Sequence, residues 1–177
     1  IHTKAYESNH PKVAASLGNL GTVLQDMGDY VGARVQHERA LAIRRKAYGP
    51  EHPKVAASLG NLGIVLHELG DYKDALALQE RALEIKRKAY GPEHPEIATT
   101  LNSVGILFRD LGDYTSARSK HERALSIRKK VYGAEHPNVA TSLNTLGIVL
   151  YDIGDYAGAR AQFDEALRIR EKALGLE

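Results

Sequence analysis

Apolar residues recur at intervals of three and four along most of the chain, in stretches separated by short polar segments. In the first stretch, Val13, Leu17, Leu20 and Leu24 follow this spacing, which is typical of one face of an α-helix and not of a strand. Pro11 stands where such a helix begins, because proline fits the first helical position, at which its missing N–H is not needed. The pattern therefore predicts an amphipathic helix of about 16 residues.

A second helix of about 18 residues is predicted directly after the first. Gly28 ends the first helix, since glycine tolerates the left-handed conformation at a helix C-terminus, and Asp29 caps the next one. Ala33, Ala40 and Leu41 then supply an inward apolar face. The two helices predict a helical hairpin.

The same hairpin is predicted four times, because the pattern repeats every 42 residues. Residues 10–51 and 52–93 agree at 30 of 42 positions without a gap. His-Pro opens each unit, and Gly-Asp-Tyr separates its two helices. A period of this length predicts an all-α solenoid in which each unit packs on its neighbours. The units are residues 10–51, 52–93, 94–135 and 136–177, preceded by residues 1–9, which match the tail of a unit.

Composition narrows the range of functions. Hydrophobic residues make up 43% of the 177 residues, enough for a packed core. The 24 Lys and Arg nearly balance the 22 Asp and Glu, so the charge of +2 gives no general attraction to nucleic acid or to a membrane surface. There is no cysteine, which excludes disulfides and thiolate sites and fits a cytoplasmic protein. No apolar run approaches the roughly 20 residues that a membrane span needs.

Several short motifs suggest chemistry but fail on spacing. The His-Pro histidines would lie too far apart in stacked repeats to share a metal ion, so we interpret them as helix caps. His37-Glu38 opens like a metalloprotease helix, but the second histidine four residues on is absent. The basic clusters, such as Arg44–Lys46, are interpreted as solvated helix ends and not as a nucleic-acid surface. We therefore expect no enzyme, no metal and no cofactor.

The repeat carries the motif of a known family. The residues concerned are Leu20-Gly21, Gly28-Asp29-Tyr30, Ala33 and Ala40-Leu41, and they resemble the tetratricopeptide repeat, a helix–turn–helix unit. The 42-residue length is similar to the long repeats of kinesin light chains. The resemblance implies a right-handed α-solenoid that binds a protein or an extended peptide in its concave groove. One departure concerns the bulky apolar residue usual midway along the second helix, where the four repeats have His37, Gln79, His121 and Phe163.

The resemblance also implies which residues line the groove, because first helices face the concave side. The candidates are Thr22, Gln25, His67, Thr99, Asn102, Arg109, Thr141, Asn144 and Tyr151. An asparagine amide both donates and accepts, so Asn102 and Asn144 would pair with a ligand's backbone. Arg109 would bind a carboxylate and Tyr151 would offer a flat apolar face. The alternative is that both asparagines make ordinary hydrogen bonds between helices.

Two other roles remain open at this point. The array would serve as an architectural spacer or a self-associating solenoid, or as the sensor arm of a larger signalling ATPase. The last second helix is expected to expose Phe163, Leu167 and Ile169, and the first helix to have only Ile1–Asn9 as cover. Head-to-tail association of copies is therefore expected. Leu176-Glu177 is also compatible with an expression-vector remnant.

Overall fold

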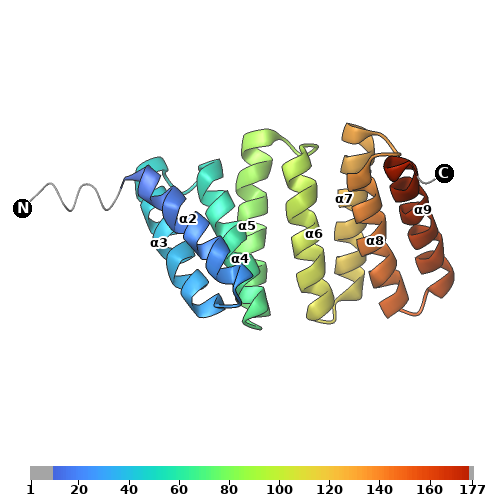
Figure 1. The fold of residues 1–177 in the computed structure, drawn as a ribbon, viewed down its shortest axis with the longest axis horizontal. Coiled ribbons are helices and arrows are strands. Elements are labelled where there is room, and N and C mark those ends of the chain that lie inside the picture. The colour runs from blue at the N-terminus through green and yellow to red at the C-terminus, as the bar shows by residue number, and fades with distance from the viewer. Residues whose placement is uncertain (1–9, 176–177) are drawn as a thin grey trace, which may run out of the picture. The chain divides into compact units, whose positions relative to one another are not determined.

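The computed structural model describes residues 10–175, which form eight helices and contain no strand. The helices pair as four hairpins (Figure 1). The pairs are α2 (Pro11–Asp26) with α3 (Tyr30–Tyr48), α4 (Pro53–Glu68) with α5 (Tyr72–Tyr90), α6 (Pro95–Asp110) with α7 (Tyr114–Tyr132), and α8 (Pro137–Asp152) with α9 (Tyr156–Leu174). First helices have 16 residues and second helices 19, which confirms the predicted fold class and hairpins.

The hairpins fall into two compact units, residues 1–89 and residues 90–177, here called the N-terminal unit and the C-terminal unit. In the N-terminal unit α3 packs on both α2 and α4, and in the C-terminal unit α7 packs on both α6 and α8. Within each unit, α3 or α7 therefore lies between the first helix of its own hairpin and the first helix of the next one.

Histidine caps open the four first helices, as the sequence predicted. The Nδ1 atom of His10 accepts the backbone N–H of Lys12 at 3.2 Å, and His52, His94 and His136 repeat this bond at 3.1–3.2 Å. In the last three repeats a tyrosine from the preceding helix stacks on the ring, with centroids 4.6–4.7 Å apart. The bond satisfies one of the free N–H groups at the helix start and explains why His-Pro marks every unit.

The turn inside each hairpin depends on backbone that glycine accepts. Gly28 has φ of 80°, and the next residue, Asp29, caps α3 by accepting the N–H of Gly32 at 2.8 Å. A side chain at Gly28 would meet no atom within 4 Å, so the left-handed backbone, and not crowding, requires glycine there.

Small residues bring the helices of a hairpin close together. Ala33 and Ala40 of α3 are 0% and 1% exposed, and Ala159 and Ala166 hold the same places in α9. In the C-terminal unit the core joins three helices. It comprises Leu125, Val139, Ala140, Leu143, Leu146, Leu150, Ala159, Ala166 and Ile169, with Phe163 packed against it.

The expectation that α9 exposes three apolar residues is right for one of them. Leu167 is 55% exposed, but Ile169 is 1% exposed and Phe163 is half-buried. Ile169 follows Ala166 by three residues, which places it on the inward face of α9, so the prediction for Ile169 was wrong. Ile1–Asn9, the expected cover of α2, lies outside the described residues.

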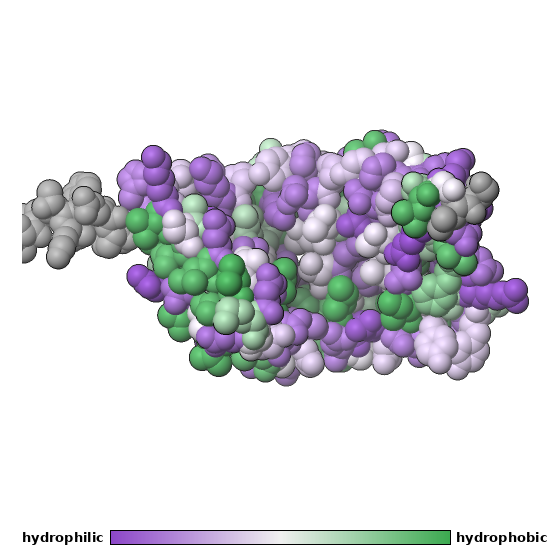
Figure 2. Space-filling view, viewed as in Figure 1, coloured by the Kyte–Doolittle hydropathy of each residue, from purple (hydrophilic) through white to green (hydrophobic). Residues whose placement is uncertain are grey.

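The apolar face of α2 is more exposed than the sequence pattern suggests. Leu20 is 47% and Val23 is 52% exposed, whereas the equivalent Leu62 and Val65 of α4 are 6% and 0% exposed. Figure 2 shows hydrophobic side chains gathered over α2. The difference arises because α4 has α3 packed on this face.

Candidate functional site

The candidate residues lie on the first helices, as predicted, but differ in how free they are. In the N-terminal unit Thr22 is exposed, and its hydroxyl donates to the carbonyl of Gly18 at 3.2 Å. Gln25 is half-buried one turn further along the same face. The half-buried His67 ring lies 5.4 Å from the ring of Tyr72.

Asn102 is engaged inside its own hairpin. It is 8% exposed, and its Oδ1 lies 3.2 Å from Nδ1 of His121, which is 1% exposed. Burial, together with the nearby charges of Arg109 and Arg128, lowers the pKa of His121 to about 4. His121 is therefore neutral at pH 7, and with the amide oxygen toward Nδ1 that nitrogen carries the ring proton. This contact is the interhelical hydrogen bond of the alternative interpretation.

Asn144, at the equivalent place in α8, has a different neighbour. The second-helix residue that matches His121 is Phe163, which has no polar atom to offer. Asn144 is half-buried, and its side chain makes no hydrogen bond to any residue that the structure describes. Its amide is available on the same helix face as Thr141 and Tyr151, which are three residues before and seven after it.

The charge of Arg109 is already balanced within the C-terminal unit. Its Nε and Nη2 atoms lie 3.1 and 2.9 Å from one carboxylate oxygen of Asp110, and Nε lies 3.9 Å from Asp152. The Arg109 side chain is 30% exposed. A ligand carboxylate would have to compete with these two residues.

The remaining candidates combine exposed apolar surface with hydroxyls bonded to their own helix. Tyr151 is 59% exposed, and its ring meets that of Tyr156 edge-on at 5.4 Å. Thr99 and Thr141 are exposed and donate to the carbonyls of Pro95 and Pro137, at 3.4 and 3.3 Å. The hydroxyls of both threonines are thus already used within their own helices, whereas the Tyr151 ring remains exposed to a binding partner.

The residue midway along each second helix, where the family usually has a bulky apolar side chain, determines how the two helices of a hairpin pack. In this chain the residues are His37, Gln79, His121 and Phe163. The side chain at this place lies directly over a glycine of the first helix. This contact was not predicted from the sequence. A Cβ on Gly21 would be 2.7 Å from the His37 ring, and one on Gly147 would be 2.6 Å from the Phe163 ring. Gln79 sits over Gly63 in the same way and donates to the carbonyl of Gly60 at 3.0 Å. The glycine that recurs at this place in the four first helices is the signal that predicts this contact: Gly21, Gly63, Gly105 and Gly147.

His37, which lies over Gly21, leaves one ring nitrogen without a hydrogen-bond partner among the described residues. His37 is 1% exposed, and its Nε2 has no hydrogen bond. Burial lowers the pKa of His37, and Arg44 lowers it further. Protonation would place a charge in a closed apolar seam, so the ring stays neutral.

One arginine in two of the three basic clusters departs from the expectation of solvated helix ends. Arg128 is 9% exposed, and its Nη1 donates to Ser142 Oγ at 2.8 Å. Arg44 is half-buried and donates to Ser58 at 2.6 Å. The cause of the error is that the α3–α4 and α7–α8 seams pass over these positions, and burial lowers the pKa of both guanidinium groups. Arg45, Lys129 and Lys130 are exposed, as expected.

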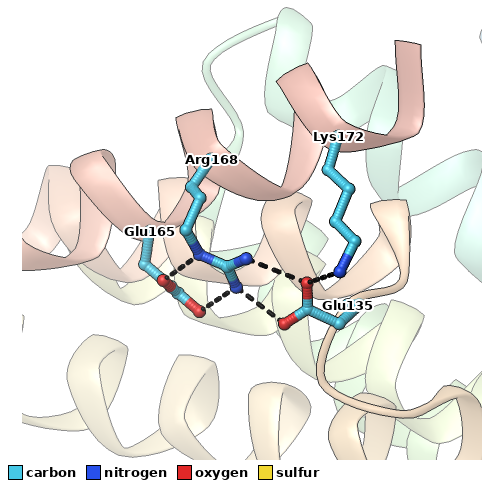
Figure 3. Close-up of polar contacts among 4 residues, drawn as sticks. All are labelled: Glu135, Glu165, Arg168 and Lys172. Atoms are coloured by element: carbon cyan, nitrogen blue, oxygen red, sulfur yellow. Dashed lines mark hydrogen bonds and ion pairs between the residues drawn. The ribbon is translucent and has the colours of Figure 1, made fainter. Parts of the chain in front are cut away.

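A glutamate in each linker between hairpins is clamped by the following second helix. Glu135 accepts from Arg168 at 2.7 and 2.9 Å and from Lys172 at 3.2 Å, and Arg168 also holds Glu165 (Figure 3). These hydrogen bonds lower the pKa of Glu135 to about 2. Glu51 meets Arg81 and Lys88 in the same manner, and Glu93 meets Arg123 and Lys130.

Residues 10–175 contain no group of His, Asp and Glu side chains arranged to hold a metal ion. Among the helices that the structure describes, none is long and apolar enough to cross a bilayer.

Repeated helical hairpins that stack through the second helix, α3 or α7, within each unit define a protein of the α-solenoid class. The chain belongs to the Tetratricopeptide repeat family, whose pattern matches residues 1–46, 12–88, 65–130 and 96–172. Members of this family generally act as non-catalytic scaffolds in protein–protein interactions. A search of curated proteins finds no match.

Solved structures with the same fold include proteins similar to kinesin light chains. BtubC (BKLC) from P. vanneervenii is 27% identical with a TM-score of 0.85, covering 94% of this chain and 66% of that protein. A Podospora anserina putative kinesin light chain with nearly identical TPR-like repeats is 25% identical with a TM-score of 0.78, covering 93% and 78%. The apo form of RapI, at 23% identity and a TM-score of 0.78, covers 90% and 56% and supports the fold alone. This chain thus spans about two thirds of the first of these proteins.

Proposed function

We propose that the chain is a non-catalytic scaffold that binds an extended peptide along the first-helix faces of its repeats, with the strongest contacts on α8. The observation that carries this proposal is the pairing of a free amide with an exposed aromatic ring on one helix face. Asn144 has no partner among the described residues, and Tyr151 is 59% exposed.

The spacing of these two residues suits an extended peptide. Seven residues of helix span about 10 Å, which corresponds to about three residues of an extended chain. The Asn144 amide would donate to one peptide carbonyl and accept from one N–H, independently of the peptide's sequence. Tyr151 would then select an apolar or aromatic side chain about three residues away, since its ring presents a flat face with a hydroxyl at its edge.

Neighbouring candidates would extend the surface with weaker contacts. Thr141 flanks Asn144 on α8, and Thr99 with Arg109 holds equivalent places on α6. Asn102 would not contact the peptide directly. Its hydrogen bond to the buried His121 would instead fix the packing of α6 on α7 beneath the surface. In the N-terminal unit Gln25 and His67 stand at the places of Arg109 and Tyr151, and Thr22 lies three residues before Gln25 on α2.

The test is a peptide-display screen against the whole chain, followed by affinity measurements on the selected peptides. Asn144→Ala should weaken binding by about tenfold, because a lost amide contact with buried peptide groups costs about 1–3 kcal/mol. Asn19→Ala, an exposed asparagine of α2 away from this surface, is the matched control and should leave the affinity unchanged. Equal affinities for the Asn144→Ala variant and the unaltered chain would contradict the proposal.

An architectural spacer is the second candidate, favoured by the clamps that fix each linker to the next second helix. It predicts that no displayed peptide is selected on α8 and that Tyr151→Ala leaves every interaction of the chain intact.

A further inference from the structure

The three linker clamps differ in one group. Two of them contain two basic and two acidic side chains, whose charges cancel. These are Glu51, Arg81, Glu84 and Lys88 on α5 and its linker, and Glu135, Glu165, Arg168 and Lys172 on α9 and its linker (Figure 3). The clamp of α7 has Arg123 and Lys130 but a single acid, Glu93, so two positive charges face one negative charge.

Ser126 stands where the α5 clamp has its second acid. It lies 42 residues after Glu84, and each of the two residues is preceded by an arginine at three positions and followed by a lysine at four. Residues at these spacings share one face of a helix. Glu84 uses both neighbours, since its carboxylate lies 3.0 Å from the Nζ atom of Lys88 and also pairs with Arg81. The Ser126 hydroxyl therefore occupies a place that a carboxylate fills in an equivalent clamp.

The Ser126 hydroxyl is accessible and uncommitted. The residue is exposed, and its side chain makes no hydrogen bond within residues 10–175. This exposure does not depend on where the sequence begins or ends, because α7 is packed between α6 and α8 within the C-terminal unit. The neighbouring Ala124 and Leu125 face the core, whereas Ser126 points to the outer surface of α7.

A phosphate group on Ser126 has the reach and the charge that the clamp lacks. Its terminal oxygens are separated from Cβ by the same number of bonds as the carboxylate oxygens of glutamate, and it carries about −1.5 to −2 charges at pH 7. The side chains of Arg123 and Lys130 are 43% and 69% exposed, so both are open to a second acceptor. Glu122, the acid one turn before Ser126, is paired with Arg118 at 2.7 Å, which reduces its repulsion of a phosphate.

We propose that Ser126 is a phosphorylation site and that its phosphate completes the α7 clamp. A protein kinase that selects arginine three residues before the acceptor transfers the γ-phosphoryl group of a nucleoside triphosphate to the Ser126 Oγ. The Oγ–P bond forms and the bond from the γ-phosphorus to the bridging oxygen breaks. The nucleoside diphosphate leaves, and the hydroxyl proton passes to a base of the kinase. Arg123 and Lys130 then hold both the phosphate and Glu93, as their equivalents in α5 hold two carboxylates.

The inference goes beyond peptide binding, because it concerns the outer face of α7 and not the α8 surface. The first test incubates the whole 177-residue chain with adenosine triphosphate and a kinase of this selectivity, and maps the phosphate by mass spectrometry. Ser126 should be the main acceptor, since no other serine or threonine of the sequence has a basic residue three positions before it. Ser119, an exposed serine of the same helix, is the internal control and should stay unlabelled. A label missing from Ser126, or equal on Ser119, would overturn the proposal.

The second test asks whether the phosphate lies in the clamp. With phosphoserine introduced at position 126 during translation, phosphorus NMR should give a second phosphate pKa below its ordinary value of about 6, because nearby cations favour the dianion. Replacing Arg123 and Lys130 by glutamine should return that pKa to its ordinary value. An ordinary phosphate pKa in the otherwise unaltered chain would show that the clamp does not hold the phosphate.

Two substitutions of Ser126 separate the effect of charge from that of helix propensity. Glutamate and glutamine have similar propensities, so Ser126→Glu should melt about 1–3 °C above Ser126→Gln through its charge alone. The difference should shrink in concentrated salt and in an Arg123→Gln background. Asn144→Ala should leave it unchanged. Equal melting temperatures for the two variants would contradict an acidic place in the α7 clamp.

Discussion

The hairpins α6–α7 and α8–α9 have the same helix lengths and the same caps, yet their seams are closed by different chemistry. In α6–α7 a buried imidazole, His121, lies over Gly105 and meets the amide of Asn102. In α8–α9 the Phe163 ring lies over Gly147 and leaves Asn144 without a partner.

The difference shows that one residue of the second helix determines whether the asparagine on the first helix is hydrogen-bonded within the hairpin or available to another molecule. A polar ring occupies its asparagine and holds it at the seam. An apolar ring closes the seam by packing alone and leaves its asparagine for another molecule. The two asparagines look equivalent in the sequence, but only Asn144 combines partial exposure with a free amide.

The largest expected effect comes from filling the apolar seam. Gly147→Ala places a Cβ 2.6 Å from the Phe163 ring, so the free energy of unfolding should fall by about 2 kcal/mol despite alanine's higher helix propensity. Gly60→Ala is the matched control: its Cβ would meet Gln79 at 3.8 Å, an ordinary contact, and should raise stability by up to about 1 kcal/mol. Chemical denaturation measures both, and equal effects would contradict the close approach.

The next largest effect is expected from replacing each of the two asparagines, because the two variants should lose different amounts of stability. Asn102→Ala leaves Nδ1 of a buried imidazole without its partner and should cost about 1–3 kcal/mol of stability. Asn144→Ala breaks no hydrogen bond between described residues and should cost less than about 0.5 kcal/mol. Denaturant midpoints compare the pair, and a larger loss from Asn144→Ala would reverse the assignment.

Acid should weaken the polar seam and spare the apolar one. His121 has a pKa of about 4 in the folded chain against 6.5 when unperturbed, so the unfolded state binds more protons between these values. Stability from this group is complete above pH 6.5 and falls by up to about 1.4 kcal/mol for each pH unit down to pH 4. His121→Gln, the residue type found at position 79, should flatten the dependence in that window. The other histidines are present in both proteins and cancel in the difference.

The smallest expected effect lies on the surface of α9. Exchanging Glu165 and Arg168 recreates the order of Arg81 and Glu84, so Glu135 should keep a basic partner and the melting temperature should hardly change. Arg168→Glu alone leaves Glu135 facing two acidic side chains and should lower the melting temperature. The stabilisation depends on a carboxylate whose pKa is depressed to about 2, so it should be present at pH 7 and disappear as the pH falls from 4.5 toward 2. A thermal melt at both pH values checks the sign.

The sequence predicts the hairpins well because their boundaries are set locally. His10 and Asp29 cap through their own side chains, and Gly28 ends a helix through its own backbone. The sequence predicts the candidate site less well, because whether a side chain is free to bind a ligand depends on which residue of another helix packs against it. Nothing local to Asn102 indicates that His121 will occupy it.

The linker clamp has a consequence for how such repeats diverge. Columns aligned at the 42-residue period contain arginine at positions 81 and 123 but glutamate at 165, and glutamate at 84 but arginine at 168. Each column alone looks unconstrained, although the sum of the two charges is kept between the second and fourth repeats. A single exchange in either column leaves two like charges three residues apart on the helix, either two glutamates or two arginines, whereas the double exchange restores a pair of opposite charges. The order of the pair therefore changes only through a less favourable intermediate, a case of epistasis that would make the charge order a durable marker of a repeat's lineage.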